Sequence, residues 1–140
     1  MKKAAVIGNP ITHSRSPMIH NYWLKKYGVE GTYEAIKAED EKDFEKVVAR
    51  LVDEDYSGFN VTVPFKEKAH DLVYYATDRG PSAYPKGLNA ANTIEIKDGK
   101  LIGHNTDYYG FIGAYREKKI KLDKIKNVVI LGAGGAARSI

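Results

Sequence analysis

The sequence contains no cysteine and no long apolar run. The lack of cysteine excludes disulfides, thiolate metal sites and cysteine nucleophiles. No stretch approaches the roughly 20 apolar residues of a membrane-spanning helix. The apolar run at residues 4–7 is also too short for a signal peptide. We therefore expect a cytoplasmic protein without a membrane partner.

Several catalytic and metal-binding patterns are absent as well. The sequence has no nucleophile elbow and no phosphate-binding P-loop. Its four histidines lack the spacing of metal ligands, so we expect no metal site. They are His13, His20, His70 and His104.

The chain is mildly basic, with 22 lysines and arginines against 18 acidic residues and a net charge of +4. This charge suits an anionic partner, whether a carboxylate, a nucleotide or a nucleic acid. The one basic cluster, at residues 118–126, has no interleaved aromatic residues. We interpret it as a solvated linker or helix face rather than a nucleic-acid site, and expect no nucleic-acid partner.

The length of 140 residues allows one domain with a proper core. Apolar periodicity predicts strands at 2–7, 31–36 and 58–63, with a helix in each interval. This βαβαβ order predicts an α/β fold with an open, mostly parallel sheet and flanking helices. In the second helix, one face carries the apolar residues Phe44, Val47, Val48, Leu51 and Val52.

The second half of the chain adds an antiparallel pair. Asp98-Gly99 between the alternating residues 92–97 and 100–104 predicts a β-hairpin, which makes the sheet mixed. The remaining expected elements are a short helix at 67–73, a loop at 74–87, a helix that begins near Asp107 and a buried strand at 128–131.

Polar residues interrupt the strand predicted at 58–63. With two-residue periodicity, Asn60 and Thr62 point to one side, and the apolar residues, Val63 among them, point to the other. Lys66 follows the carboxyl end of this strand, where open α/β sheets bind their ligands. An edge strand followed by a surface lysine explains the same pattern, so both interpretations stay open.

Ser14 and Ser16 precede the first predicted helix. Ser16 is expected as its N-cap and Pro17 as its first residue. The two hydroxyls, the free N–H groups and the helix dipole favour an anion there, although a cap and a loop residue explain the pattern equally well. The helix is expected to end at Gly28. Its apolar stripe consists of Met18, Ile19, Tyr22, Trp23 and Tyr27.

A glycine-rich segment follows the strand predicted at 128–131. A strand that runs directly into Gly-x-Gly-x-x-Ala opens a dinucleotide-binding unit, because the glycines allow a tight turn and the close approach of a pyrophosphate. The next helix has barely begun at Ile140, so we expect this chain alone to form no complete cofactor site. The candidate cofactor contacts are Gly132, Ala133, Gly134, Gly135 and Ala136.

Five blocks of residues follow one another between Gly8 and Arg138. They are Gly8-Asn9-Pro10-Ile11-x-His13-Ser14-x-Ser16-Pro17-x-x-His20-Asn21, Asn60-Val61-Thr62-x-Pro64-x-Lys66, Asn92-Thr93, Gly103-x-Asn105-Thr106-Asp107-x-x-Gly110-Phe111 and Gly132-Ala133-Gly134-Gly135-Ala136-x-Arg138. In this order they closely resemble the shikimate dehydrogenase family. The resemblance implies a shikimate-binding catalytic domain at 1–118, and a linker with the truncated start of an NADP-binding Rossmann domain at 119–140.

The resemblance also implies an activity, the NADPH-dependent, reversible reduction of 3-dehydroshikimate to shikimate in aromatic amino acid biosynthesis. It makes Lys66 and Asp107 the catalytic pair. This agrees with the chemistry, because reducing a ketone requires a proton donor and oxidising an alcohol requires a proton acceptor. The implied substrate contacts are Ser14 and Ser16 on the carboxylate, Thr62, Asn92 and Asp107 on ring hydroxyls, Lys66, and Asn60 as a supporting or secondary contact.

The sequence departs from the family pattern in two places. Asn89-Ala90-Ala91 replaces the usual Gly-Ala-Val, and we expect the turn to form because asparagine tolerates a left-handed backbone. A proline-containing loop at 79–86 stands where the family tends to be helical and alanine-rich. Two other functions stay open: a quinate-type dehydrogenase, since one extra hydroxyl needs only small pocket changes, and a non-catalytic small-molecule-binding fragment. No feature of the sequence indicates which oligomeric state the protein adopts.

Overall fold

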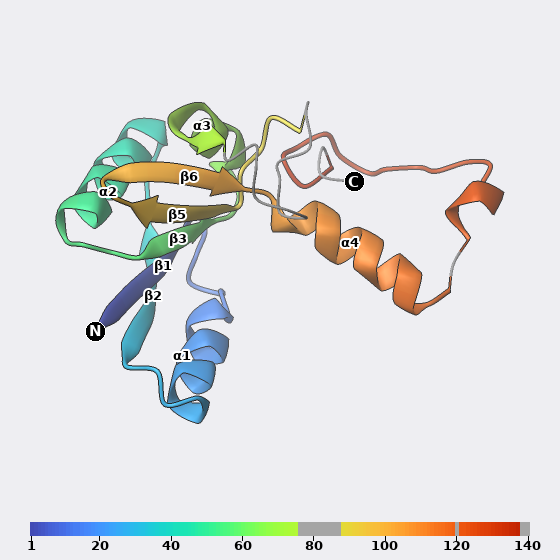
Figure 1. Ribbon diagram of the computed structural model, residues 1–140. Coiled ribbons are helices and arrows are strands. Elements are labelled where there is room, and N and C mark those ends of the chain that lie inside the picture. The colour runs from blue at the N-terminus through green and yellow to red at the C-terminus, as the bar shows by residue number, and fades with distance from the viewer. Residues whose placement is uncertain (76–87, 120, 138–140) are drawn as a thin grey trace.

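The computed structural model describes residues 1–75, 88–119 and 121–137. Its centre is one sheet with the strand order β2-β1-β3-β5-β6-β4 (Figure 1). The strands are β1 (Lys2–Gly8), β2 (Gly31–Lys37), β3 (Gly58–Val61), β4 (Tyr74–Tyr75), β5 (Thr93–Lys97) and β6 (Lys100–His104).

The strands pair in both directions. β1 runs parallel to β2 and β3, and β4 runs parallel to β6, whereas β5 is antiparallel to β3 and β6. This pairing confirms the open, mostly parallel mixed sheet expected from the βαβαβ order. The predicted hairpin supplies an antiparallel pair, and its turn has positive φ at Asp98 (51°) and Gly99 (69°), as a tight two-residue turn requires.

Helices lie on both faces of the sheet. α2 and α3 cover one face and α1 the other, while α4 extends away from the sheet (Figure 1). None of the described helices is long and apolar enough to cross a bilayer. The helices are α1 (Ser16–Lys26), α2 (Glu41–Asp53), α3 (Lys66–Leu72) and α4 (Thr106–Glu117), followed by the 3-10 turn η2 (Leu122–Lys124).

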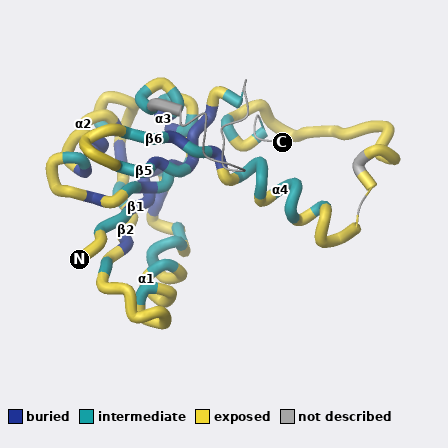
Figure 2. Tube along the Cα trace, viewed as in Figure 1, coloured by how far each residue is buried: buried dark blue, intermediate teal, exposed yellow. Residues whose placement is uncertain are grey.

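The main core lies between the sheet and α2. The buried parts of the chain are concentrated in the central strands (Figure 2). α2 begins after Asp40, whose carboxylate accepts the backbone N–H of Asp43 at 2.8 Å and so caps the helix. Its apolar face is buried as predicted, with Val52 at the margin. The buried cluster includes Phe44, Val47, Val48 and Leu51 from α2 and Phe59, Val61 and Ile94 from the sheet.

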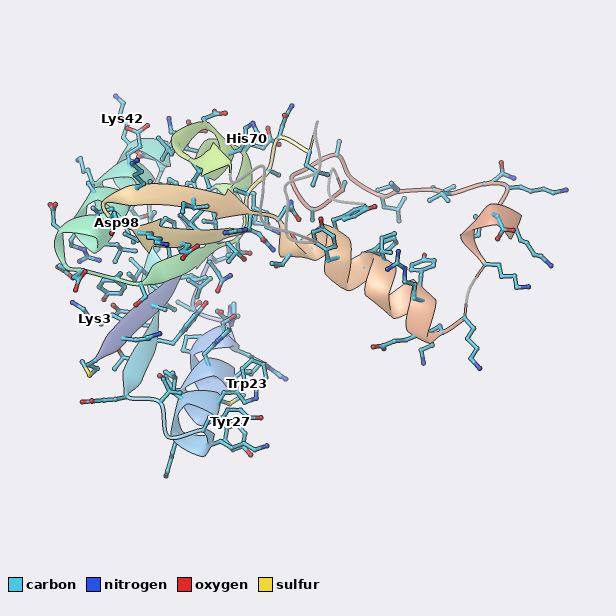
Figure 3. All side chains as sticks on the ribbon, viewed as in Figure 1. Lys3, Trp23, Tyr27, Lys42, His70 and Asp98 are labelled. Atoms are coloured by element: carbon cyan, nitrogen blue, oxygen red, sulfur yellow. The ribbon has the colours of Figure 1, made fainter. Side chains whose placement is uncertain are left out.

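The apolar stripe of α1 faces away from the sheet. Trp23 is 47% exposed and Tyr27 is 68% exposed, and both lie on the outer side of the helix (Figure 3). The helix is instead held to the edge strand β2 by a polar contact. Asn21 accepts the backbone N–H of Tyr33 at 2.9 Å and donates to its carbonyl at 2.7 Å. Periodicity therefore predicted this helix correctly, but it does not identify the face that contacts the sheet.

Two elements begin or end at other residues than the sequence predicted. α1 begins at Ser16 after Arg15, with no side-chain cap, so the expectation that Ser16 is the N-cap is wrong. The Oγ of Ser14 instead accepts the backbone N–H of Ser16 at 3.3 Å. β3 ends at Val61, and Val63, which was expected on the apolar side of the strand, is 61% exposed.

The segment expected as a loop at 74–87 contains a short strand. β4 pairs with β6 next to Ile102 and Gly103, a pairing too short to predict from periodicity. The proline-containing loop at 79–86 lies outside the described residues. The following turn forms as expected, with a left-handed φ of 45° at Asn89.

No strand forms at residues 128–131, which contradicts the buried strand predicted there. Val129 is 84% exposed and Leu131 is 95% exposed. No strand of the described chain lies beside this segment to pair its backbone, and strand structure depends on such pairing. The described side chains of the basic cluster at 118–126 are also exposed, as expected for a solvated linker.

The substitution Phe44→Ala should lower the free energy of unfolding by about 3–5 kcal/mol, the usual cost of truncating a buried phenylalanine. Phe44 is fully buried and stacks on Phe65, the residue before α3, with ring centroids 5.0 Å apart. Urea unfolding measures the change. Phe111→Ala is the matched control, because Phe111 is only half buried on α4. Equal losses in the two variants would contradict this description of the core.

Candidate active site

Four element ends meet at one edge of the sheet. β1 and β3 are parallel neighbours, so the loops that follow them leave from the same edge. A hydrogen bond of 3.0 Å from the backbone N–H of Asn9 to the carbonyl of Val63 joins these loops. β5 is antiparallel to β3, so it begins at this edge, where Thr93 also pairs with His104 at the end of β6.

Lys66 and Asp107 form an ion pair at this edge. Lys66 is the first residue of α3, and Asp107 lies in the first turn of α4. The lysine Nζ donates to Oδ2 of the aspartate at 2.5 Å. The lysine side chain is only 13% exposed and the aspartate side chain 36%, so the pair is open to ligands mainly on the aspartate side. The structure thus joins the two residues that were expected to form the catalytic pair.

Asn92 holds the second oxygen of Asp107. Its Nδ2 donates to Oδ1 of Asp107 at 2.8 Å, and its own Oδ1 accepts the backbone N–H of Thr106 at 2.9 Å. Asn92 is 8% exposed, so these bonds form away from bulk water. With one oxygen on Asn92 and the other on Lys66, the carboxylate of Asp107 is fixed in orientation.

Asn105 sets the beginning of α4. Its Oδ1 accepts the backbone N–H groups of Asp107 at 3.1 Å and Tyr108 at 3.3 Å, which makes it the N-cap. Its Nδ2 donates to the carbonyl of Ala90 at 2.7 Å. Asn105 is fully buried, although no residue of α4 itself is buried. This one side chain therefore fixes the helix end that carries Asp107.

Asn60 lies behind Asn92 rather than beside the ion pair. Its Oδ1 accepts the hydroxyl of Tyr33 at 2.7 Å. Its Nδ2 donates to Oγ1 of Thr93 at 3.0 Å and to the carbonyl of Asn92 at 3.3 Å. Both amide hydrogens of Asn60 are used within the protein, as are those of Asn92, whose Nδ2 also donates to Oγ1 of Thr106 at 2.9 Å.

Ser14, Ser16 and Thr62 lie on the loops at the same edge. Both serines are half buried, and Thr62 donates its backbone N–H to the carbonyl of Ile7 at 2.9 Å. Within the described chain, no hydrogen bond connects these three residues to Lys66 or to its aspartate. The structure therefore brings Lys66, Asn92, Asp107 and Asn60 into one network and places the other three expected residues on adjoining loops.

The glycine-rich turn contacts Lys66. Gly132 has a φ of 110°, a backbone geometry that favours glycine. A Cβ at position 135 would lie 3.0 Å from the Cβ of Lys66, closer than such atoms normally approach. Glycine at this position therefore lets the turn lie directly against the ion-paired lysine. Backbone N–H groups on such a turn are the donors that a pyrophosphate requires.

Burial changes the proton affinity of two residues behind the site. It raises the pKa of Tyr33 to about 12, so this hydroxyl stays protonated at neutral pH and can donate. It lowers the pKa of His20 from its usual value of 6.5, which favours a neutral ring. That ring stacks on Tyr33 with centroids 4.2 Å apart. Within the described ranges, no group of His, Asp or Glu side chains could hold a metal ion.

The arrangement can hold and move a proton beside a bound molecule. An ammonium group next to an oriented carboxylate suits proton transfer to or from a ligand oxygen. Tyr33, Thr93 and Asn105 were not among the site residues expected from the sequence. The blocks Asn92-Thr93 and Asn105-Thr106-Asp107 pointed to two of them, but nothing indicated Tyr33, because tyrosine is common in strands.

Comparison with known proteins adds a family to this geometry. Residues 6–94 match the family model described as the shikimate dehydrogenase substrate binding domain. The shikimate dehydrogenase (NADP(+)) of Brucella abortus (strain S19) is 41% identical over 139 residues, which cover 99% of this chain and 46% of the relative. The chain therefore spans about half the length of the curated relatives that it matches.

Solved structures agree with this match. Shikimate dehydrogenase 1 from Peptoclostridium difficile has a TM-score of 0.84 at 31% identity. The match covers 99% of this chain and 50% of the Peptoclostridium difficile chain. Shikimate 5-dehydrogenase from Thermus thermophilus, in complex with shikimate, has a TM-score of 0.82 at 34% identity. This match covers 100% of this chain and 51% of the Thermus thermophilus chain. The chain belongs to the family of the shikimate dehydrogenase substrate binding domain.

Proposed function

We propose that this protein acts as an NADP-dependent shikimate dehydrogenase, in which residues 1–118 form the substrate pocket and supply the proton-transfer pair. The observation that carries the proposal is the ion pair of Lys66 with Asp107, whose carboxylate Asn92 holds at the edge of the sheet. The reaction converts 3-dehydroshikimate, NADPH and a proton into shikimate and NADP. It therefore needs a residue that moves a proton at the reacting oxygen.

The relatives support the choice of substrate. Curated relatives carry the name shikimate dehydrogenase (NADP(+)), and the Thermus thermophilus relative has been solved with shikimate and with NADP(H) and shikimate together. The matching family model concerns the substrate-binding domain in particular. This supports shikimate rather than the cofactor as the main ligand of residues 1–118.

Lys66 donates and accepts the proton. During reduction, its ammonium group donates a proton to the carbonyl oxygen, which becomes the hydroxyl of the product, and during oxidation its amine takes that proton back. Asp107 holds the lysine Nζ in place and offers its more exposed side to a ring hydroxyl. The low exposure of the lysine limits competition from water for the same proton.

Ser14 and Ser16 bind the carboxylate of the substrate at the beginning of α1. The free N–H groups and the dipole of this helix favour a negative charge there. Thr62 and Asn92 bind ring hydroxyls from the neighbouring loops, and Asn60 supports Asn92 from behind. The carboxylate and the reacting oxygen are thus held by different loops of one sheet edge.

Residues 132–136 would hold the pyrophosphate of NADP. The glycines of this turn fit a pyrophosphate because they leave the backbone N–H groups accessible, and the contact of Gly135 with Lys66 puts the turn next to the proton donor. When bound, the cofactor would supply a hydride as NADPH or accept one as NADP. The chain's own contribution is to bring this turn and the substrate loops together.

Turnover assays test the proposed function. The protein as its gene encodes it should oxidise shikimate with formation of NADPH, and its kcat/KM for shikimate should exceed that for quinate. Turnover of quinate alone would indicate the quinate-type alternative. No turnover of either compound would overturn the proposal.

Replacing both Ser14 and Ser16 by alanine should weaken shikimate binding by roughly 1–3 kcal/mol, because charge-assisted hydrogen bonds to the carboxylate are lost. Calorimetric titration measures the change. Ser57→Ala is the control, since Ser57 is an exposed residue whose backbone N–H bonds to the carbonyl of Lys3. Binding as tight as in this control would show that the two serines do not hold the carboxylate.

Lys66→Met should lower kcat by roughly 10²–10⁴ with a smaller change in KM, because methionine keeps much of the apolar stem but cannot carry a proton. Lys68→Met is the matched control. Lys68 lies on the same helix and also forms an ion pair, but its partner is Glu45 rather than Asp107. If kcat of Lys66→Met stays within a few-fold of the control, Lys66 is not the proton carrier.

The 140-residue polypeptide should bind shikimate weakly and catalyse no turnover. All six proposed substrate contacts lie in its described part, whereas residues 128–131 are exposed and form no strand to support the glycine-rich turn. NMR titration with shikimate and an NADPH assay test the two halves of this prediction. Turnover above background would refute the second half, and spectra unchanged by shikimate would show that the pocket is not preformed.

A further inference from the structure

Four side-chain hydrogen bonds form one continuous chain from the edge strand β2 to the ion pair, and each donor points toward Asp107. This hydrogen-bond chain crosses the sheet through β3 and β5, so it joins residues that are far apart in the sequence. The four bonds are Tyr33 Oη to Asn60 Oδ1 (2.7 Å), Asn60 Nδ2 to Thr93 Oγ1 (3.0 Å), Thr93 Oγ1 to Asn92 Oδ1 (3.1 Å) and Asn92 Nδ2 to Asp107 Oδ1 (2.8 Å).

Backbone groups fix the direction of this chain. The Nδ2 of Asn60 faces the carbonyl of Asn92, which can only accept a hydrogen bond, so the amide of Asn60 cannot be reversed. The Oδ1 of Asn92 faces the backbone N–H of Thr106, which can only donate, so this amide is fixed as well. Thr93, between the two amides, must then accept from Asn60 and donate to Asn92. Tyr33 must donate, which its raised pKa allows at neutral pH.

This hydrogen-bond chain is buried at its remote end, whereas Asn60 and Thr93 in its middle are half buried and line an open pocket. Tyr33 is 6% exposed and is held in place by the ring of His20 and by the amide of Asn21. Hydrogen bonds in such surroundings are strong and polarise one another, and a partner left without its bond is costly. A change at Tyr33 therefore affects the groups that follow it along the chain.

We infer that Tyr33 and Thr93 are positioning residues for the reaction, acting through Asn60 and Asn92 on the carboxylate of Asp107. This inference rests on the proposed function. The side chain of Asp107 is 36% exposed, so its carboxylate is held by Lys66 on one oxygen and by Asn92 on the other rather than by close packing. A proton carrier is effective only within a narrow range of distances and angles, so the carboxylate that orients Lys66 must itself be held. Neither Tyr33 nor Thr93 needs to touch the substrate.

Kinetics of the protein as its gene encodes it test this inference. Tyr33→Phe removes only the hydroxyl, and Thr93→Val keeps the branched shape that suits a strand. Each should lower kcat roughly 5- to 30-fold, the rate equivalent of one lost hydrogen bond, and leave KM for NADP unchanged. The matched controls are Tyr22→Phe and Thr32→Val, because both residues are exposed outside the hydrogen-bond chain. A kcat equal to that of the controls would overturn the inference. So would an unchanged kcat together with a raised KM for shikimate.

Two further measurements separate positioning from loss of folding. Thr93→Ser restores the hydroxyl and should recover most of the kcat that Thr93→Val loses. In 1H–15N spectra without substrate, Tyr33→Phe should shift the side-chain amide signals of Asn92, whereas Tyr22→Phe should not. An unmoved Asn92 signal, or a serine variant as slow as the valine variant, would overturn the inference. If the wild-type protein oxidises no shikimate, the proposed function fails, but the spectra still decide whether Tyr33 positions Asn92.

Discussion

The candidate site depends on the ion pair between Lys66 and Asp107. It joins the first turns of α3 and α4, and α4 has no buried residue to fix it by packing. In a shielded pair, removal of one partner leaves a charge without compensation, which costs more than the pair contributes. Asn92 lessens this cost on the aspartate side because it continues to bind the second carboxylate oxygen. The pair and its amide therefore act as one unit.

Asparagine joins the elements around this unit. Each of four asparagines bridges two segments because a side-chain amide both donates and accepts. Asn21 joins α1 to β2, Asn60 joins β3 to β5, Asn92 joins the start of β5 to α4, and Asn105 joins α4 to Ala90. The partners of Asn21 and Asn105 are backbone groups, which do not change when side chains are substituted. Asn60 and Asn92 bond mainly to side chains. The sheet and the helix ends thus set the frame of the site, and side chains set the orientation of Asp107 within it.

The fold could be predicted from the sequence wherever one segment contains the whole physical cause. The apolar face of α2, its Asp40 cap and the Asp98-Gly99 turn are of this kind. Prediction failed where the cause lies in another segment. The stripe around Trp23 is exposed because α1 attaches to the sheet through Asn21, and residues 128–131 form no strand without a neighbour. The family resemblance predicted Lys66 and Asp107 as a catalytic pair, and the structure joins them in an ion pair. Tyr33 is linked to this pair through residues on other strands, and no local sequence pattern indicates such a link.

The side chains that link Tyr33 to Asp107 by hydrogen bonds, Asn60, Thr93 and Asn92, are all neutral, and burial explains this. Tyr33, Asn92 and Asn105 are each less than a tenth exposed, and a charge at any of these positions would need its own partner. Hydroxyls and amides transmit orientation through directed hydrogen bonds without adding a buried charge. The only charged groups of the network, Lys66 and Asp107, lie at its outer end, where Asp107 is partly open to solvent. Charge is therefore confined to the open end of the network, where we propose that the proton moves, and directed neutral hydrogen bonds hold Asp107 there.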